Sequence, residues 1–208
     1  AVLAKFPSAK WASYEANGNS PELDAAAVAF GAGSEVVYKL EAADILLTVD
    51  RDILGVEGDI SLVRGFAARR KVDNANTAMN RLYVVENRYT LTGGMSDHRL
   101  RLAASRSSSF LKALALQLSK SLSDGALGKL AADLKAPETK IKAGWVEECA
   151  ADLVAHKGKA LVLVGQRQPA AVQALGFAIN NALGAVGKGL LVRKSLGSPS
   201  LGISELAA

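Results

Sequence analysis

The chain is most informative over the stretch Leu82-Tyr-Val-Val-Glu-Asn-Arg-Tyr-Thr-Leu-Thr-Gly-Gly-Met-Ser-Asp-His-Arg-Leu-Arg-Leu102. It starts with an apolar, partly β-branched run, Leu82 to Val85, which suits a strand in the middle of a sheet. A polar loop follows, and apolar residues return after Asp97. Because α/β folds place ligands beyond the carboxyl ends of their strands, the loop predicts a nucleotide-type site between two strands.

Strand and helix signals alternate on the amino-terminal side of this stretch. The segment Pro21 to Phe30 predicts a helix, because proline and acidic residues favour a first turn and Gly31 can end it. The short apolar run Asp44 to Asp50 predicts a strand, and Ser61 to Arg70 has apolar residues at helical spacing. This order predicts parallel strands joined by right-handed crossovers, and therefore an α/β fold.

The alternation continues on the carboxyl-terminal side. Apolar residues three and four apart predict amphipathic helices over Ser107 to Leu122 and over Trp145 to Val154. Lys159 to Gly165 predicts a strand, and Pro169 suits the start of the helix after it. The turn between them, Gly165-Gln-Arg-Gln168, lies at a helix amino end, where free backbone N–H groups favour an anion. A tight βα turn without a ligand also explains this pattern.

A boundary separates these two halves. The segment Ser123 to Thr139 carries two glycines and Pro137, which are typical of a linker. We therefore divide the chain into a Rossmann-like α/β lobe at residues 1–136 and a second, truncated α/β lobe at residues 137–208. The abrupt ends of the sequence lead us to expect a piece of a longer protein.

Composition argues against several classes of function. Of the 208 residues, 50% are apolar and 5% aromatic, and 25 basic against 20 acidic residues give a net charge of +5. The basic residues are dispersed, so we expect no nucleic-acid partner. The sequence has no apolar run of about 18 residues, so we expect no direct membrane insertion. The single cysteine, Cys149, lies on an apolar helix face and cannot form an intrachain disulfide or an all-cysteine metal site.

The ionisable residues form no recognisable catalytic motif. His98 and His156 lie in different predicted lobes, outside any metal-ligand spacing, and we interpret His98 as structural. Asp50 and Asp52 flank Arg51 at the carboxyl end of a predicted strand, where α/β folds bind ligands. Two carboxylates there can hold a cation or sugar hydroxyls, and a salt-bridged loop is the alternative interpretation.

Two stretches carry a family resemblance. Leu82 to Asp97 is similar to the motif of the molybdopterin-guanine-dinucleotide oxidoreductases, in which an apolar strand runs into Asp-Pro-Arg, two spaced threonines and Ala-Asp. Leu161 to Lys188, with its Gln168 turn, resembles a later part of the same large subunit. The closer resemblance is to the fused iron–sulfur and molybdopterin-like subunit of bacterial alternative complex III, often named an iron–sulfur hydrogenase component. It rests mainly on Met79 to Leu100 and on Gln166 to Pro169.

The resemblance implies three-layer, Rossmann-like lobes with mostly parallel sheets, as in the dinucleotide-binding domains of this family. It also implies which residues would contact a cofactor. The nucleotide end would be lined by Glu86, Arg88, Thr90, Thr92 and Asp97, and the phosphates by Gly165, Gln166 and Arg167.

Three departures from cofactor-binding relatives indicate an empty or altered site. Glu86-Asn87 replaces Asp-Pro, Asp50-Arg51-Asp52 replaces small residues beside the cofactor, and the sequence after Gly189 lacks a glycine- and asparagine-rich stretch. Each carboxylate close to a pyrophosphate is repelled by roughly 1–4 kcal/mol at surface-like dielectrics. We therefore expect no cofactor in this chain, with molybdopterin guanine dinucleotide as the alternative, and no catalytic or metal-binding residue.

The resemblance implies a function as a non-catalytic, molybdopterin-like scaffold domain in a periplasmic, quinol-oxidising electron-transfer complex. The partners would be an iron–sulfur, ferredoxin-like part of the same parent chain and membrane or cytochrome subunits, and the parent complex would be an oxidoreductase. One alternative is a fragment of a molybdopterin-guanine-dinucleotide-binding oxidoreductase. Another is a stand-alone α/β domain that binds a small molecule at the Gly165 turn.

Overall fold

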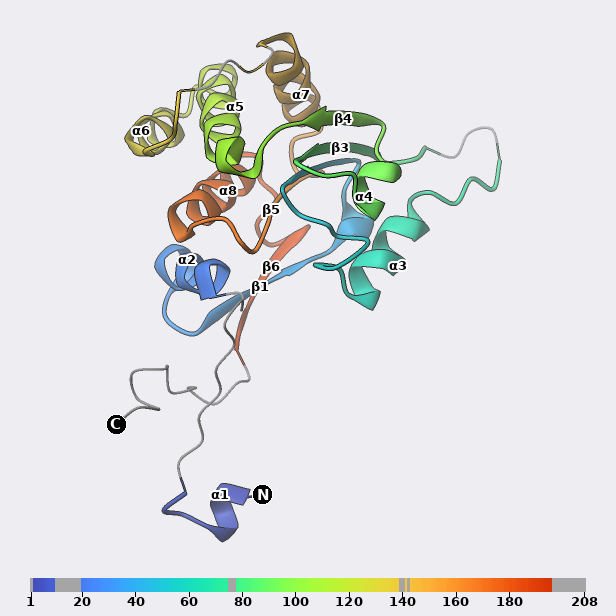
Figure 1. Ribbon diagram of the computed structural model, residues 1–208. Coiled ribbons are helices and arrows are strands. Elements are labelled where there is room, and N and C mark those ends of the chain that lie inside the picture. Colours follow the sequence, from blue (N-terminus) through green and yellow to red (C-terminus); the bar gives the residue numbers. More distant parts are fainter. Residues whose placement is uncertain (1, 10–19, 75–77, 139–140, 142, 196–208) are drawn as a thin grey trace.

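The computed structural model describes residues 2–9, 20–74, 78–138, 141 and 143–195. Helices and strands alternate along most of this length (Figure 1). The helices are α1 (Val2–Lys5), α2 (Ser20–Phe30), α3 (Ile60–Ala68), α4 (Leu91–Gly94), α5 (Ser107–Leu122), α6 (Gly125–Asp133), α7 (Ala143–Ala155) and α8 (Ala170–Ala182), with short 3-10 turns at Leu40–Ala42 and Ala104–Arg106. The strands are β1 (Ser34–Tyr38), β2 (Ile45–Val49), β3 (Arg81–Glu86), β4 (His98–Arg101), β5 (Ala160–Val164) and β6 (Leu190–Lys194).

A parallel four-stranded sheet forms the centre of the fold. Its strand order is β4-β3-β2-β5, and every neighbouring pair is parallel. The register pairs Val49 with both Val85 and Val164, so β2, β3 and β5 end at the same edge. A separate antiparallel pair, β1 with β6, packs below this sheet.

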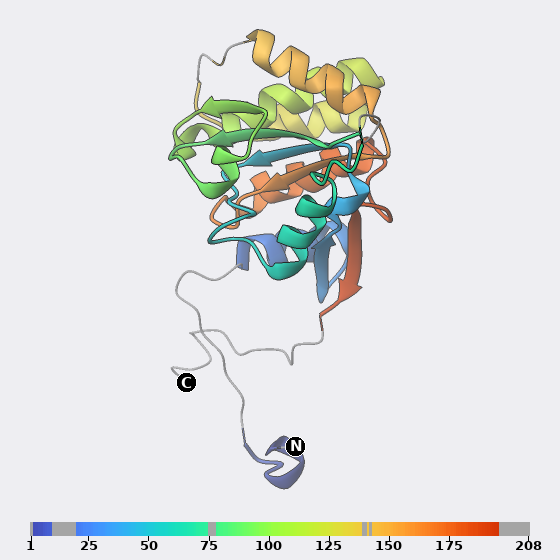
Figure 2. The same cartoon turned by 90° about the vertical axis from the view of Figure 1, so that its right-hand side faces the viewer.

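Helices cover both faces of the parallel sheet, which gives the three layers expected of a Rossmann-like α/β fold. One face packs Ile45, Leu47 and Val49 against α5, α7 and α8. The other face packs Leu46 against α2, α3 and the β1–β6 pair. Figure 2 shows α5 and α7 above the sheet and α3 below it. Cys149 is fully buried in the first of these cores, and burial raises the pKa of its thiol.

Most elements expected from the sequence are present. The strand expected after residue 44 is β2, the apolar run from Leu82 is β3, and the chain re-enters the sheet as β4 directly after Asp97. The helix expected over Ser107 to Leu122 has the same bounds in the structure. The prediction of a mainly parallel, Rossmann-like α/β fold is therefore confirmed.

Helix α6 lies within Ser123 to Thr139, the segment that the sequence predicts to be a linker. The prediction of a linker without a helix is therefore wrong for this part. Its two glycines weaken local helix propensity. Asp124 nevertheless caps the helix by accepting a hydrogen bond from the Leu127 amide at 2.9 Å. A Cβ at Gly128 would lie 2.5 Å from the Ser119 hydroxyl oxygen, so glycine permits close packing against α5. Tertiary packing thus outweighs propensity in this segment.

The sequence also missed β1 and β6. Their residues pair from Ser34 with Lys194 to Tyr38 with Leu190, across most of the described chain. Such a distant partner leaves no local signal. The division into lobes at residues 1–136 and 137–208 remains a prediction, but β5 from the second segment pairs directly with β2 from the first, so the two segments share one sheet.

Candidate functional site

The candidate site lies at the carboxyl edge of the parallel sheet. Three loops meet there because β2, β3 and β5 end in register. They are residues 50–52 after β2, residues 87–92 after β3, and residues 165–168 after β5. This is the edge at which parallel α/β sheets bind ligands.

The loop after β2 begins with an unusual backbone conformation. Asp50 has φ +55°, in the left-handed region that few non-glycine residues adopt. Its buried carboxylate accepts a hydrogen bond from the Gln168 side-chain amide at 2.9 Å and lies 3.8 Å from the Arg167 guanidinium. A Cβ at Gly165 would overlap the Asp50 carbonyl oxygen, so this close approach of two loops requires glycine.

The Asp52 carboxylate joins the loops after β2 and β3. It accepts hydrogen bonds from the Thr92 hydroxyl at 2.7 Å and from the Thr92 amide at 3.2 Å. The same carboxylate accepts one from the Val56 amide at 3.2 Å. Burial acts to raise the pKa of Asp52, but these hydrogen bonds outweigh it and hold that pKa below its ordinary value. The Thr92 hydroxyl oxygen in turn accepts from the Leu54 amide.

Glu86 ends β3 as a second buried carboxylate. It accepts a hydrogen bond from the Thr90 hydroxyl at 2.6 Å and pairs with the Arg99 guanidinium at 2.5 Å. The Thr90 oxygen also accepts from the Gly93 amide and caps α4. Both threonines of the predicted motif therefore bind carboxylates of this chain.

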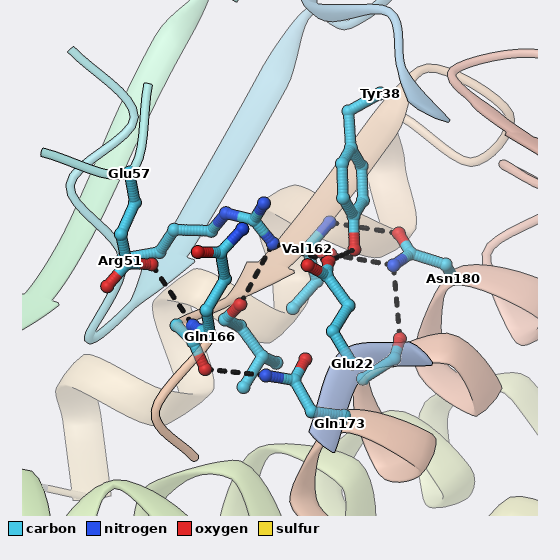
Figure 3. A network of polar contacts seen from close by, with 11 residues as sticks. Glu22, Tyr38, Arg51, Glu57, Val162, Gln166, Gln173 and Asn180 are labelled. Atoms are coloured by element: carbon cyan, nitrogen blue, oxygen red, sulfur yellow. Dashed lines mark hydrogen bonds and ion pairs between the residues drawn. The ribbon is translucent and has the colours of Figure 1, made fainter. Parts of the chain in front are cut away.

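A buried ion pair occupies the side of the edge nearest α2, where Glu22 meets Arg51 (Figure 3). The Arg51 guanidinium donates to Glu22 at 2.6 Å and to the Val164 carbonyl at 3.1 Å. The Tyr38 ring lies 5.1 Å from the guanidinium carbon. Burial, with the nearby Glu22 charge, raises the pKa of the Tyr38 hydroxyl, which therefore stays neutral.

Glu57 is a further carboxylate beside Arg51. It accepts a hydrogen bond from the Gln166 amide at 3.1 Å. Burial raises the pKa of Glu57, and the Gln166 amide and the Arg51 charge only partly oppose this effect. Figure 3 shows Glu57, Arg51 and Gln166 close together between the ends of β2 and β5.

The structure brings most of the predicted site residues to this edge. Arg88 is exposed there, and Arg167 reaches toward Asp50 from an exposed position. The predicted residues gathered at the edge are Glu86, Arg88, Thr90, Thr92, Gly165, Gln166 and Arg167.

Asp97 lies at the opposite edge of the sheet. It precedes β4, and because β3 and β4 are parallel, it meets the amino end of β3. Its carboxylate accepts a hydrogen bond from the Leu82 amide at 2.7 Å and pairs with Arg70. Burial acts to raise the pKa of Asp97, but the hydrogen bonds from Arg70 and Leu82 hold it below the ordinary value. Asp97 therefore connects strands rather than lining the nucleotide edge.

Sequence reasoning missed several polar residues of the edge. Gln168 lies in the turn that starts at Gly165, but the sequence predicts no contact for its side chain. Glu22 and Tyr38 come from α2 and β1, far from the motifs, and no local pattern predicts their contact with Arg51. The acidic residues on both sides of Arg51 are the sequence signal for such contacts, because a salt-bridged loop is one interpretation of that pattern.

The residues present do not fit a dinucleotide. The space between Asp50, Asp52, Glu57 and Glu86 is only about 10 Å³. That volume holds about one water molecule. Four carboxylates line this space together with the guanidinium groups of Arg51, Arg88 and Arg167. No step involving a bound pterin cofactor can therefore be derived at this edge.

Further ionisable and aromatic side chains lie away from the carboxyl edge in the described part of the chain. Within it, no group of three or more His, Cys, Asp or Glu side chains has the arrangement of a metal site. His98 stacks on Tyr83 with ring centres 4.6 Å apart. None of the helices in the described ranges is long and apolar enough to cross a lipid bilayer.

Comparison with known proteins gives distant structural matches and no sequence match. No protein-family model and no curated protein matches this sequence. The fold is similar to acetylene hydratase from Pelobacter acetylenicus, with a TM-score of 0.60 and 15% sequence identity over 82% of this chain. The chain spans about a quarter of that protein, since the match covers 25% of it. At this level of identity the likeness shows a shared α/β fold.

Proposed function

We propose that this chain is a non-catalytic, molybdopterin-like scaffold domain from a subunit of a quinol-oxidising electron-transfer complex. The observation that carries the proposal is that the polar groups of the nucleotide edge bind one another. Asp52 holds Thr92, and Glu86 holds Thr90. A cofactor would have to replace these buried hydrogen bonds, each of which costs about 1–3 kcal/mol when one partner is left unsatisfied.

The carboxylates at this edge supply a second argument. The buried Asp52 carboxylate accepts hydrogen bonds from both the Thr92 hydroxyl and the Val56 amide. These bonds join the loops after β2 and β3 without any ligand. A site that is stable when it binds its own side chains suits a structural role. The parent complex would then place its oxidation chemistry in other domains, as the sequence resemblance implies.

The resemblance to alternative complex III supplies the finer part of the proposal. It implies an iron–sulfur, ferredoxin-like part of the same parent chain, membrane or cytochrome subunits as partners, and a periplasmic location. These three statements rest mainly on the stretch Met79 to Leu100 and on the turn at Gln166 to Pro169.

Metal and pterin analysis of the full-length protein tests the scaffold role. We expect iron from the neighbouring part but neither molybdenum nor tungsten in stoichiometric amount, and no pterin after acid extraction. Stoichiometric molybdenum or tungsten that is lost when Glu86 and Asp52 are changed to Ala would overturn the proposal. A cofactor retained in that double variant would have to bind elsewhere.

One observation favours a second candidate, a fragment that binds a guanine nucleotide. Arg88 is exposed beside Glu86, and among the described residues it has no carboxylate partner. Calorimetric titration of this chain with GMP and GDP separates the two candidates. Binding that Arg88→Ala abolishes and Lys129→Ala leaves intact would favour the nucleotide-binding role. The scaffold role predicts no saturable heat in any of the three proteins.

A further inference from the structure

A cavity of about 270 Å³ lies beside Arg51, and it is distinct from the small space between the four carboxylates. Its walls come from α2, β1, β6, the start of α3 and the loops after β2 and β5. Cavities that bind drug-sized molecules commonly have volumes of about 300–1,000 Å³. The cavity beside Arg51 therefore suits a smaller ligand.

The cavity lies where the strand order of the parallel sheet reverses. From β2 the chain continues to β3 and β4 on one side, and β5 is then added on the other side of β2. Open α/β sheets bind ligands in the crevice at such a reversal, outside the carboxyl ends of the strands. Arg51 follows β2 and Gln166 follows β5, and both line the cavity. The topology of the sheet thus favours a ligand at this position.

Arg51 brings a buried guanidinium to the wall of the cavity. Its side chain is only 6% exposed. Both hydrogen bonds that it donates to described residues start from Nη1, and they reach Glu22 and the Val164 carbonyl. Its Nε is buried and finds no acceptor in the described part of the chain. The guanidinium therefore keeps donor capacity after its contacts within the protein.

Two other polar side chains of the wall have unused hydrogen-bonding groups. Glu22 accepts from Arg51 and Tyr38 through Oε1, and no described residue donates to its Oε2. Gln166 donates to Glu57 from its backbone amide, while its side-chain amide has no partner among the described residues. Figure 3 shows Glu22, Tyr38 and Arg51 converging from α2, β1 and the loop after β2. The cavity thus offers donors and acceptors side by side.

The charges that line the cavity are compensated within the protein. Glu22 pairs with Arg51 at 2.6 Å, and Glu35 pairs with Arg193 at 3.1 Å. The remaining charged group of the wall, Asp59, caps α3 by accepting from two backbone amides, and a helix amino end favours a carboxylate. Three carboxylates against two guanidinium groups disfavour an anion. A cation would have to compete with partners that each carboxylate already has.

We propose that this cavity binds a small, neutral molecule with several hydroxyl groups, of the size of a monosaccharide. A hydroxyl both donates and accepts, so it can donate to Glu22 and accept from Arg51. Val36 and Leu62 add apolar surface to the wall, which suits the C–H groups of a sugar ring. The inference goes beyond the scaffold role and does not depend on it.

Saturation-transfer difference NMR of the full-length protein tests the inference. The probes are glucose, galactose, arabinose, ribose and myo-inositol, each titrated separately. We expect a saturable signal from at least one of them. Phosphate and ethanolamine serve as an anionic and a cationic competitor, and neither should displace the bound probe, because the charges of the wall are already paired.

Two variants with matched controls locate the binding. Gln166→Ala should weaken it about tenfold, because the side-chain amide is lost while the backbone amide can still donate to Glu57. Gln117→Ala on α5, which covers the opposite face of the sheet, should have no effect. Ser61→Tyr should abolish binding by filling the cavity, and Ser121→Tyr makes the same change at an exposed position of α5. Thermal melting without probe checks that each variant is folded.

Three outcomes would overturn the inference. They are no saturable signal from any probe, binding that Gln166→Ala leaves unchanged, and displacement of the probe by phosphate or ethanolamine. If Ser61→Tyr does not fold, Gln166→Ala against Gln117→Ala decides alone. Failure of the scaffold role is distinguishable, since it appears in the metal and pterin measurements whatever the sugar titrations show.

Discussion

The side chain of Asn180 on α8 forms with Val162 both backbone hydrogen bonds that a neighbouring strand would form. Its carbonyl oxygen accepts from the Val162 amide at 2.9 Å, and its amide donates to the Val162 carbonyl at 2.7 Å. The residues are labelled together in Figure 3. Since β5 is an edge strand of the sheet, Asn180 protects an edge that would otherwise expose unpaired backbone groups.

Replacing Asn180 with leucine should destabilise the protein strongly. The change leaves the Val162 amide and carbonyl buried without partners, at a cost of about 2–4 kcal/mol for the two groups. Asn181→Leu is the matched control, because the neighbouring asparagine is exposed. Urea denaturation of both variants measures the difference. Equal midpoints would contradict the role of Asn180.

Gly165→Ala should lower stability by about 1–3 kcal/mol through overpacking. The new Cβ would overlap the Asp50 carbonyl oxygen, so the loops after β2 and β5 would have to separate. Gly144→Ala tests the specificity of this effect, because nothing lies within 4 Å of a Cβ at that position in α7. The control should be neutral or slightly stabilising, as alanine favours helices. Thermal melting of the two variants gives the comparison.

The buried Glu22–Arg51 pair should show strong coupling. Arg51→Met leaves the Glu22 carboxylate buried without its partner, which costs about 3–5 kcal/mol. Adding Glu22→Gln removes that charge and should recover much of the loss. A double-mutant cycle from denaturation curves measures the coupling energy. Additive single-variant effects would show that the two groups do not interact as a pair.

The lowered pKa of Asp52 predicts a loss of stability in acid. In the unfolded chain this carboxyl titrates near its ordinary value of 3.8, and in the folded protein it titrates lower. Its contribution is therefore fully present above the unfolded pKa and is lost as the pH falls through the folded pKa. Thr92→Val removes one donor to Asp52 and should weaken this dependence. Denaturation midpoints of both proteins between about pH 2 and 5 provide the measurement.

The raised pKa of Glu57 predicts a pH dependence of stability opposite to that of Asp52. Burial raises its pKa above the ordinary 4.5, so its contribution is fully present below the unfolded pKa and is lost as the pH rises through the folded pKa. Glu57→Gln removes the buried charge and keeps an oxygen that can accept from the Gln166 amide. The variant should therefore melt at a higher temperature than the parent at neutral pH. The advantage should shrink as the pH falls through the folded pKa toward 4.5, and an advantage that is constant with pH would contradict the assignment.

Much of the fold was readable from sequence because its signals are local. The apolar run from Leu82 becomes β3, Asp97 marks the start of β4, and the leucine spacing after Ser107 becomes α5. The ends of the strands also indicated the edge where Asp50, Glu86 and the Gly165 turn meet. Periodicity and turn chemistry depend on neighbouring residues, so they can be read along the chain.

Contacts between distant residues were decided by the tertiary structure alone. Only the strand register and the packing of helices on the sheet could bring Asp52 to Thr92, Glu22 to Arg51 and Asn180 to Val162, because each pair joins different elements. The same register carried Asp97 to the other edge of the sheet. The sequence determined which strands end in polar loops. The packing of those loops determined that their carboxylates and threonines bind one another, because burial leaves polar groups no other partners.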